Sequence, residues 1–459
     1  MRENFTAMLI RVVIDNVLSF GQQKEFHLLP SPRLRTLSSH IYTIGGIELL
    51  KLSAIYGANG AGKSNLVRAI AFLKELVLTE RIPLAFKKTP FKFQEQPQNS
   101  LQTLAIEFVQ EDVAFYYGIG IRNQIIVTEE LYVSGLGKRE DELIFERNTD
   151  ADGRCSLQFS AAFERIPKNQ TLKELLLEEF IKNDKPILQL IANRENEALQ
   201  LAKKAFRWFK DSLVLIDPDV HASALPHQID VDGQLAKFAN QFIQGMSLGI
   251  QKIETLKIDA AQMIHNTGLP EKLVNALSEA DNKMLGLWSG NKETVLVEEN
   301  GTIWAKELQL QHLGGQAMLV DFDADEESDG TMRLLDFIPA FKGLTEMPKV
   351  YIIDEMERSL HPLLVKELVK KFSLDEQTKG QLIFTTHESN LLDQSLLRQD
   401  EIWFAEKDAQ GCTDLYALSA FKEHKSIDIQ KGYLSGRYGS IPFLGNLHDL
   451  NWHDYAHQK

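Results

Sequence analysis

The 459-residue sequence predicts an α/β fold, in which a parallel core sheet and an antiparallel β-layer are interrupted by a helical insertion. The first observation is the stretch 51–66, in which an apolar strand passes into a glycine-rich turn and the start of a helix. The second is the alternation of apolar and polar residues over 103–134, which is typical of antiparallel strands with one wet face. The third is a series of apolar strands over 350–405 separated by helices, which favours parallel strands joined by crossovers.

The N-terminal part is expected to supply the antiparallel layer. Apolar and β-branched residues over 8–15 and 24–28 predict two strands. A helix is expected over 62–79, because large apolar residues recur on one face from Leu66 to Val77. After a proline-punctuated link over 83–97, further strands are expected at 103–109, 113–121, 125–134 and 142–148.

Helical periodicity dominates from about residue 171 to residue 290. Thr171 is an expected N-cap, and Glu174 stands at the capping-box position. Helices are expected at 186–210, 233–248 and 270–287. The chain is therefore divided into the N-terminal half of an α/β domain (1–165), a helical insertion (166–290) and the C-terminal half of the same domain (291–459).

The last third alternates strands and helices. Apolar strands are expected at 350–353, 381–385 and 401–405, and helices at 361–372 and 389–397. This alternation is typical of parallel strands with crossover helices.

The loop after the 51–56 strand fits the pattern G-x-x-x-x-G-K-[ST] from Gly57 to Ser64. Glycines let backbone N–H groups approach phosphate oxygens, and the following helix N-terminus adds to the anion site. The Lys63 amine can reach the β- and γ-phosphates, and the Ser64 hydroxyl can ligate Mg²⁺. The sequence thus predicts a site for ATP and Mg²⁺ built from Gly57, Asn59, Gly60, Gly62, Lys63, Ser64 and Asn65.

A second motif, Val350-Tyr-Ile-Ile-Asp-Glu, is an apolar strand that delivers two carboxylates to the edge of the sheet. Asp354 is expected to hold Mg²⁺, directly or through water. Glu355 is placed to polarise the attacking water. Together with Lys63 in the glycine-rich loop, this pair predicts ATP hydrolysis.

Three more motifs flank this strand: Ser328-Asp-Gly-Thr before it, and Ser359-Leu-His-Pro and Thr385-Thr-His-Glu after it. The set resembles the ATP-binding-cassette (ABC) superfamily, in the branch of chromosome-maintenance ATPases, RecF and the overcoming-lysogenisation-defect nucleases. The resemblance implies an ABC-type head, in which Ser328 and Gly330 contact the nucleotide of a second protomer. It also implies that Ser359 begins the D-loop and that His387 is the catalytic switch histidine. A polar cap at a strand end is the alternative for His387.

The resemblance leaves the Q-loop glutamine open. Gln94 and Gln96 are both candidates for the residue that contacts Mg²⁺ and the lytic water. The Ser-Asp-Gly-Thr signature departs from the Leu-Ser-Gly-Gly-Gln of transporters, and no membrane domain is recognised. Both departures point away from transport.

A closer resemblance covers nearly the whole chain outside the insertion. The segments Ile14-Asp-Asn-Val-Leu-Ser-Phe-Gly, Ile402-Trp-Phe-Ala-Glu-Lys-Asp and Lys431-Gly-Tyr-Leu-Ser-Gly-Arg-Tyr resemble stand-alone bacterial cassette ATPases of anti-phage loci, including the PARIS type. This implies a homo-oligomer that senses a phage-encoded trigger protein and holds a separate effector, a Toprim-type nuclease. The nuclease is expected to be another chain, since this sequence ends soon after the last cassette element.

The composition and charge of the chain limit the classes of partner that it is expected to bind. The formal net charge of −14 argues against a surface built for phosphate backbones. The best basic cluster, Lys203 to Lys210, is interleaved with aromatic residues and is interpreted as a helix face whose apolar side is buried. No apolar run reaches the length of a membrane span, and two widely separated cysteines favour a reducing, cytoplasmic setting. A RecF-like repair ATPase that binds DNA directly is the alternative function.

Overall fold

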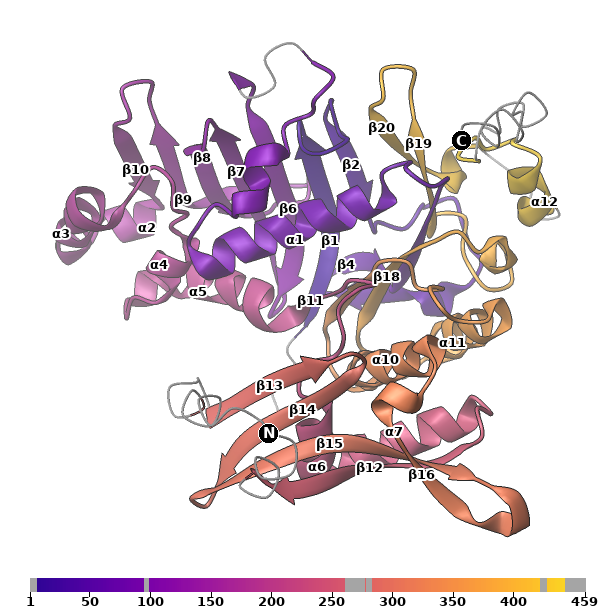
Figure 1. Cartoon of the computed structure of the whole chain (residues 1–459). Coiled ribbons are helices and arrows are strands. Elements are labelled where there is room, and N and C mark those ends of the chain that lie inside the picture. Colours follow the sequence, from indigo (N-terminus) through magenta and orange to yellow (C-terminus); the bar gives the residue numbers. More distant parts are fainter. Residues whose placement is uncertain (1–5, 95–98, 261–276, 278–282, 422–426, 442–459) are drawn as a thin grey trace, which may run out of the picture.

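The computed structural model describes residues 6–94, 99–260, 277, 283–421 and 427–441. Within these residues the chain forms three main sheets, which Figure 1 shows with the helices between them. A short two-stranded ribbon, β3 (Ile41–Ile44) and β4 (Ile47–Leu50), accompanies them. No helix in the described part of the chain is both long and apolar enough to cross a membrane.

The central sheet has the strand order β11-β17-β18-β5-β19-β20. Neighbouring strands run parallel, except that β20 pairs antiparallel with β19. The expected parallel core sheet is therefore confirmed, and residues from early and late in the sequence share it. Its strands are β5 (Leu52–Tyr56), β11 (Leu213–Ile216), β17 (Val350–Ile353), β18 (Gln381–Thr386), β19 (Ile402–Lys407) and β20 (Thr413–Ala417).

The expected antiparallel layer is a seven-stranded sheet with the order β10-β9-β8-β7-β6-β1-β2. The strands predicted in this part of the sequence begin and end almost where the alternation of apolar and polar residues places them. The strands are β1 (Ala7–Asp15), β2 (Lys24–His27), β6 (Gln102–Gln110), β7 (Val113–Arg122), β8 (Ile125–Val133), β9 (Glu142–Thr149) and β10 (Cys155–Phe159).

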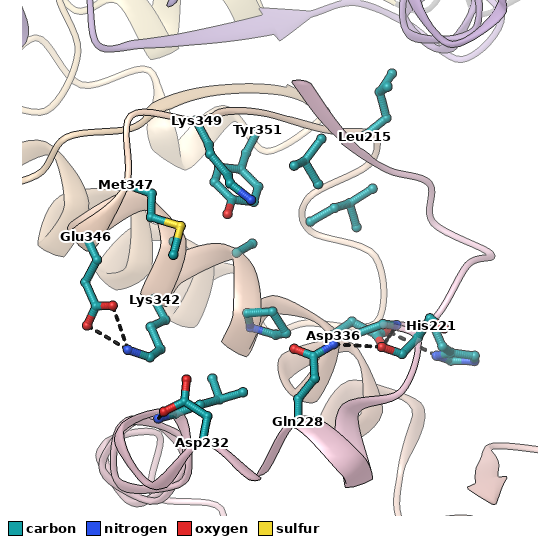
Figure 2. A pocket seen from close by; sticks show the side chains of 18 of the residues that line it. Leu215, His221, Gln228, Asp232, Asp336, Lys342, Glu346, Met347, Lys349 and Tyr351 are labelled. Carbon is teal, nitrogen blue, oxygen red and sulfur yellow. Dashed lines mark hydrogen bonds and ion pairs between the residues drawn. The ribbon is translucent and has the colours of Figure 1, made fainter. Parts of the chain in front are cut away.

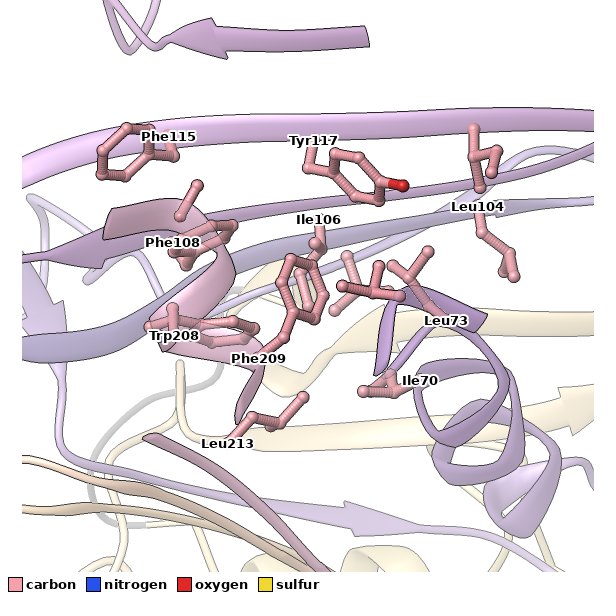
Figure 3. Packing of buried hydrophobic residues seen from close by; sticks show 14 of the residues in the cluster. Ile70, Leu73, Leu104, Ile106, Phe108, Phe115, Tyr117, Trp208, Phe209 and Leu213 are labelled. Atoms are coloured by element: carbon pink, nitrogen blue, oxygen red, sulfur yellow. The ribbon is translucent and has the colours of Figure 1, made fainter. Parts of the chain in front are cut away.

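Helix α1 (Lys63–Thr79) lies between the antiparallel layer and the central sheet. Its apolar face is buried, and Ile70 and Leu73 join a cluster that contains residues of both sheets (Figure 3). Burying a large apolar side chain stabilises a fold by about 1.5–3 kcal/mol. The apolar spacing that predicted this helix therefore also fixes the position of its first turn, where the phosphate-binding loop ends.

The basic cluster of Lys203 to Lys210 has the predicted character. Trp208 and Phe209 are fully buried, and Trp208 stacks on Phe108 with ring centroids 4.2 Å apart (Figure 3). On the opposite side Lys204 and Arg207 form ion pairs of 3.1 and 3.4 Å with Glu111. The apolar side packs the core, and part of the positive charge is already neutralised.

Residues 166–290 are less helical than expected. The strand β11 lies within them and joins the central sheet beside β17. Its four apolar residues, Leu213-Val-Leu-Ile, are too few for periodicity to distinguish a strand from a helix. The expected helix over 186–210 is interrupted, because the Asn196 side chain accepts the N–H of Ala198 and caps a new turn.

The helix expected at 233–248 is present as α7. The one expected at 270–287 lies mostly outside the described residues, and its described end is a strand, β13. The described α-helices between β10 and β12 are α2 (Ala161–Glu164), α3 (Pro167–Leu175), α4 (Leu188–Ala192), α5 (Gln200–Arg207), α6 (Leu225–Val231) and α7 (Gly233–Gly245).

A third sheet packs against α6, α7 and the long helix α10 (Asp329–Glu346). It has the order β12-β15-β14-β13, with β16 also paired to β15, and all pairs are antiparallel. The strands are β12 (Ile250–Asp259), β13 (Met284–Ser289), β14 (Lys292–Glu299), β15 (Thr302–Leu313) and β16 (Leu319–Asp323).

The C-terminal crossovers differ in one place from the expectation. Helix α11 (Pro362–Leu374) follows β17 as predicted, and α12 (Ile429–Leu434) comes later. The helix expected at 389–397 is wrong, because only the 3₁₀ turn Ser389–Leu391 forms. The Asp393 carboxylate accepts the N–H and the hydroxyl of Ser395, a local bonding pattern that competes with helix formation.

Candidate nucleotide site

The glycine-rich loop joins the end of β5 to the start of α1. Gly62 has a φ of 111°, and a Cβ there would lie 2.1 Å from Thr413 Oγ1. A Cβ on Gly57 would lie 2.4 Å from the carbonyl oxygen of Ala405 in β19. Both positions therefore require glycine, and the loop is pressed closely against the strands β19 and β20.

Lys63 is buried in this loop, with 5% of its side chain area exposed. Its Nζ donates to the carbonyl oxygens of Gly57 (2.7 Å) and Ala58 (3.2 Å) and lies 3.1 Å from His387 Nε2. Burial lowers the pKa of Lys63 to about 8, against the opposing charges of Glu357, Asp354 and Glu355. The amine therefore remains mainly protonated at neutral pH, as a phosphate-binding lysine must be.

His387 follows β18 and faces the same loop. Burial lowers its pKa, the Lys63 charge lowers it further, and a hydrogen bond with the Gly57 backbone opposes both. The imidazole is therefore neutral at pH 7 and keeps one N–H for donation. His387 thus contacts the Lys63 amine, and its role as switch histidine or polar strand cap stays a prediction.

Two residues that sequence reasoning missed brace the loop from behind. Thr413 Oγ1 lies 2.7 Å from Ser19 Oγ and 2.9 Å from the carbonyl oxygen of Ala61. The Asn65 side chain also donates to Ser19 Oγ, at 2.8 Å, so it supports the loop rather than facing outward. Ser19 stands in the recognised N-terminal segment, whereas nothing in the sequence around Thr413 indicates its role.

The two acids after β17 are held by one threonine. Thr385 Oγ1 donates to Asp354 Oδ1 at 2.5 Å and accepts the backbone N–H of Glu355 at 2.8 Å. Asp354 is 4% exposed, and Glu355 is in the left-handed region with a φ of 48°. A left-handed non-glycine residue costs about 1–2 kcal/mol. The strand end is thus fixed by Thr385 in a conformation that a free chain would avoid.

The signature and D-loop segments contact each other. Ser328 is the N-cap of α10 and accepts the N–H of Thr331 at 3.2 Å. A Cβ on Gly330 would lie 2.6 Å from the carbonyl oxygen of Ser359. The signature is therefore held against the D-loop by packing at Gly330, and the expected contact of Ser328 and Gly330 with a nucleotide stays a prediction.

Of the two candidate Q-loop residues, only Gln94 lies in the part of the chain that the structure describes. Gln94 donates its side-chain N–H to Asn16 Oδ1. Gln96 lies outside the described residues. The choice between them stays a prediction.

The donors present fit a magnesium nucleotide. The described residues contain no group of three His, Cys, Asp or Glu side chains that could hold a metal ion by themselves. Mg²⁺ in nucleotide sites is usually bound by one or two protein groups together with substrate phosphates. Ser64 and Asp354 are the groups that this chain offers for that role.

A cavity of about 710 Å³ lies between β11, α10 and β17 (Figure 2). Its polar lining includes the Lys342–Glu346 ion pair of 2.7 Å and the Asp336–His221 pair of 3.0 Å. None of the residues of the glycine-rich loop lines it. This cavity is therefore separate from the glycine-rich loop.

The family described as "AAA domain, putative AbiEii toxin, Type IV TA system" matches residues 52–393, which include the glycine-rich loop, both acids and His387. The chain belongs to this family. Membership makes it a P-loop ATPase-type protein with the α/β fold described above. No curated protein matches the chain.

Three solved structures are similar at low scores. The SMC head domain from Thermotoga maritima has a TM-score of 0.37 at 11% identity, and covers 89% of this chain and 98% of that chain. An SmcHead bound to the C-winged helix domain of ScpA has a TM-score of 0.40 at 14% identity, covering 90% and 99%. The Pyrococcus furiosus Smc head, bound to the C-terminal domain of ScpA, has a TM-score of 0.39 at 14% identity, covering 94% and 100%.

Proposed function

We propose that this chain binds ATP with Mg²⁺ and hydrolyses it. The main support for this proposal is that Lys63 and His387 contact each other at the glycine-rich loop. Thr385 holds Asp354 and Glu355 nearby. Backbone N–H groups of the loop and the Lys63 amine bind the phosphates. Mg²⁺, held by Ser64 and Asp354, supplies positive charge against the phosphate oxygens.

In this proposal Glu355 is the general base. Its carboxylate accepts hydrogen bonds from the attacking water and orients it toward the γ-phosphate. The neutral His387 donates its N–H to the γ-phosphate and senses its presence. In the proposal, Ser328 and Gly330 contact the nucleotide of a second copy.

Glu355→Gln tests this assignment. The amide keeps the shape of the side chain but cannot accept a proton, so hydrolysis should fall by about 10²–10⁴-fold while ATP still binds. The expected result is a stable ATP-bound oligomer, measured by size-exclusion chromatography with light scattering. Lys63→Ala, which should not bind ATP, is the matched negative control. Normal turnover by Glu355→Gln would exclude Glu355 as the base.

We further propose that the ATPase regulates a bacterial anti-phage system in the cytoplasm. The family's description links such domains to toxin–antitoxin systems. The sequence also resembles the ATPase subunit of the PARIS abortive-infection system. The chain would then hold a separate Toprim-type nuclease until a phage protein releases it. Plaque assays with the native locus test this: Lys63→Ala should abolish protection, and protection by that variant would refute an ATP-dependent role.

A RecF-like ATPase that binds DNA directly has less support. Lys204 and Arg207 of the best basic cluster are already paired with Glu111. Direct binding predicts hydrolysis that DNA stimulates and that added salt suppresses steeply. Hydrolysis rates with and without duplex DNA at two salt concentrations separate the two functions.

A further inference from the structure

Glu357 lies between the acids of β17 and the D-loop, and the mechanism above does not use it. Its Oε1 accepts the backbone N–H of His387 at 2.5 Å. Its Oε2 is buried and has no hydrogen-bond partner among the described residues. Glu357 is half-buried, and a buried oxygen without a partner is costly, so a role besides packing is expected of this side chain.

The same side chain acts on the groups around the glycine-rich loop. Burial lowers the pKa of Lys63 and of His387, and in each case Glu357 is the first of the carboxylates whose charge opposes that change. Glu357 also raises the pKa of the buried Tyr56, after the larger effect of burial. Glu357 is therefore close to both sides of the phosphate-binding loop.

The backbone at His387 is fixed by side-chain oxygens at two successive positions. Glu357 holds the N–H of His387, and Thr386 Oγ1 accepts the N–H of Glu388 at 3.0 Å. This anchoring directs the imidazole toward the Lys63 amine, 3.1 Å away.

We propose that Glu357 is a positioning residue, which holds the backbone of His387 so that its imidazole faces the γ-phosphate position. The inference rests on the proposed ATPase function. It assigns to Glu357 the role of a hydrogen-bond acceptor, and it predicts that the amide of glutamine can replace the carboxylate.

Four variants test this role in ATP hydrolysis. Glu357→Leu removes the acceptor and should lower kcat by about ten- to a hundredfold, because small misplacements of a catalytic group cost rates of that order. Glu357→Gln should stay close to the wild type. His387→Ala should match Glu357→Leu, and the double variant should lose no more than either alone. The surface variant Glu367→Gln controls for the loss of one carboxylate.

Backbone hydrogen exchange of peptides spanning 384–392, in the nucleotide-free protein, gives a readout that does not depend on hydrolysis. The amide of His387 should exchange about tenfold faster in Glu357→Leu than in the wild type. In Glu357→Gln its exchange rate should equal that of the wild type. Three results would each overturn the proposal. They are an unchanged exchange rate in Glu357→Leu, additive losses of kcat in the double variant, and a Glu357→Gln variant that is as impaired as Glu357→Leu. A wild-type chain without hydrolysis but with this exchange pattern would refute the ATPase function and leave the positioning role standing.

Discussion

Thr385 is the residue on which the two acids of the site depend most directly. One hydroxyl both donates to Asp354 and accepts from the N–H of Glu355. The sequence shows Thr385 only as part of a motif, because its role is defined by a partner that is 31 residues away in the chain. Motif residues can therefore be recognised without revealing which of them is supporting and which reacts.

Thr385→Val should separate these roles. The valine keeps the shape of threonine but leaves Asp354 and the Glu355 N–H without this partner, which costs about 1–3 kcal/mol of unfolding free energy. Chemical denaturation measures this loss, and ATP hydrolysis should fall by at least about tenfold. Thr385→Ser keeps the hydroxyl and should restore both. A valine variant with wild-type turnover would show that the bond does not align the acids.

The two glycines of the loop offer a matched pair. Gly60 and Gly62 both have positive φ, but a Cβ on Gly60 meets nothing within 4 Å, whereas one on Gly62 meets Thr413 at 2.1 Å. Gly60→Ala should cost about 1–2 kcal/mol from backbone strain alone. Gly62→Ala should cost more and also abolish ATP binding. Thermal unfolding and a fluorescent-nucleotide titration measure both effects, and equal losses would contradict the contact with β20.

At the scale of elements, α10 links the signature to the rest of the head. Ser328 caps this helix, and Arg333, one turn further, donates to the carbonyl oxygens of Asp354 (3.1 Å) and Asp217 (3.1 Å). The helix therefore connects the signature with the strand end that carries the acids. Under the proposed function, a change at the N-cap should have two separable consequences, one for helix stability and one for a second copy of the chain.

Ser328→Asp distinguishes the two. Aspartate caps helices about as well as serine, so the unfolding free energy should stay within about 0.5 kcal/mol of the wild type. Its negative charge would repel the nucleotide of a second copy, so ATP-dependent oligomerisation and hydrolysis should be lost. Ser328→Ala, which loses the cap, should be less stable by about 1 kcal/mol. A fully active Ser328→Asp would limit Ser328 to capping.

Elements differ in how well the sequence predicts them. The strands of the antiparallel layer and helix α1 follow from the spacing of their apolar residues, although β6 is buried on both faces. The strand β11 was not predicted, because four consecutive apolar residues show neither a helical nor a strand periodicity. It forms a strand by pairing with β17, which lies more than 130 positions later in the chain. The helix expected at 389–397 does not form beyond its first turn, because the Asp393 carboxylate accepts the N–H of Ser395 locally. The apolar spacing of the sequence does not reveal this competing bond.

At the scale of the whole molecule, the nucleotide site is a product of long-range pairing. The sequence predicted the loop, the acids and His387, since each carries its own local pattern. It could not predict that Ser19 and Thr413, 394 positions apart, meet behind the loop. Such contacts arise only when the sheet brings β5 between β18 and β19.

Ligand binding should therefore stabilise the molecule as a whole. The loop contacts β18, β19 and β20, so a nucleotide held there favours the folded state of the central sheet. At a concentration 100 times its dissociation constant, a ligand adds about 2.7 kcal/mol of stability. Glu355→Gln with Mg-ATP should unfold in one transition at a higher temperature, and Lys63→Ala should show no shift. A shift confined to part of the molecule would show that the sheet does not couple the site to the fold.

The contact of Ser19 and Thr413 behind Ala61 also bears on how the protein is made. A chain emerging from the ribosome carries the glycine-rich loop early, but β18, β19 and β20 follow more than 300 residues later. Until then the loop lacks both the strands that flank β5 and the hydroxyl that braces it. Pairing over such separations is intrinsically slow, because the entropy of closing the chain is lost before the contacts form. We therefore expect the loop of a nascent chain to stay without its braced conformation until β18, β19 and β20 have been synthesised.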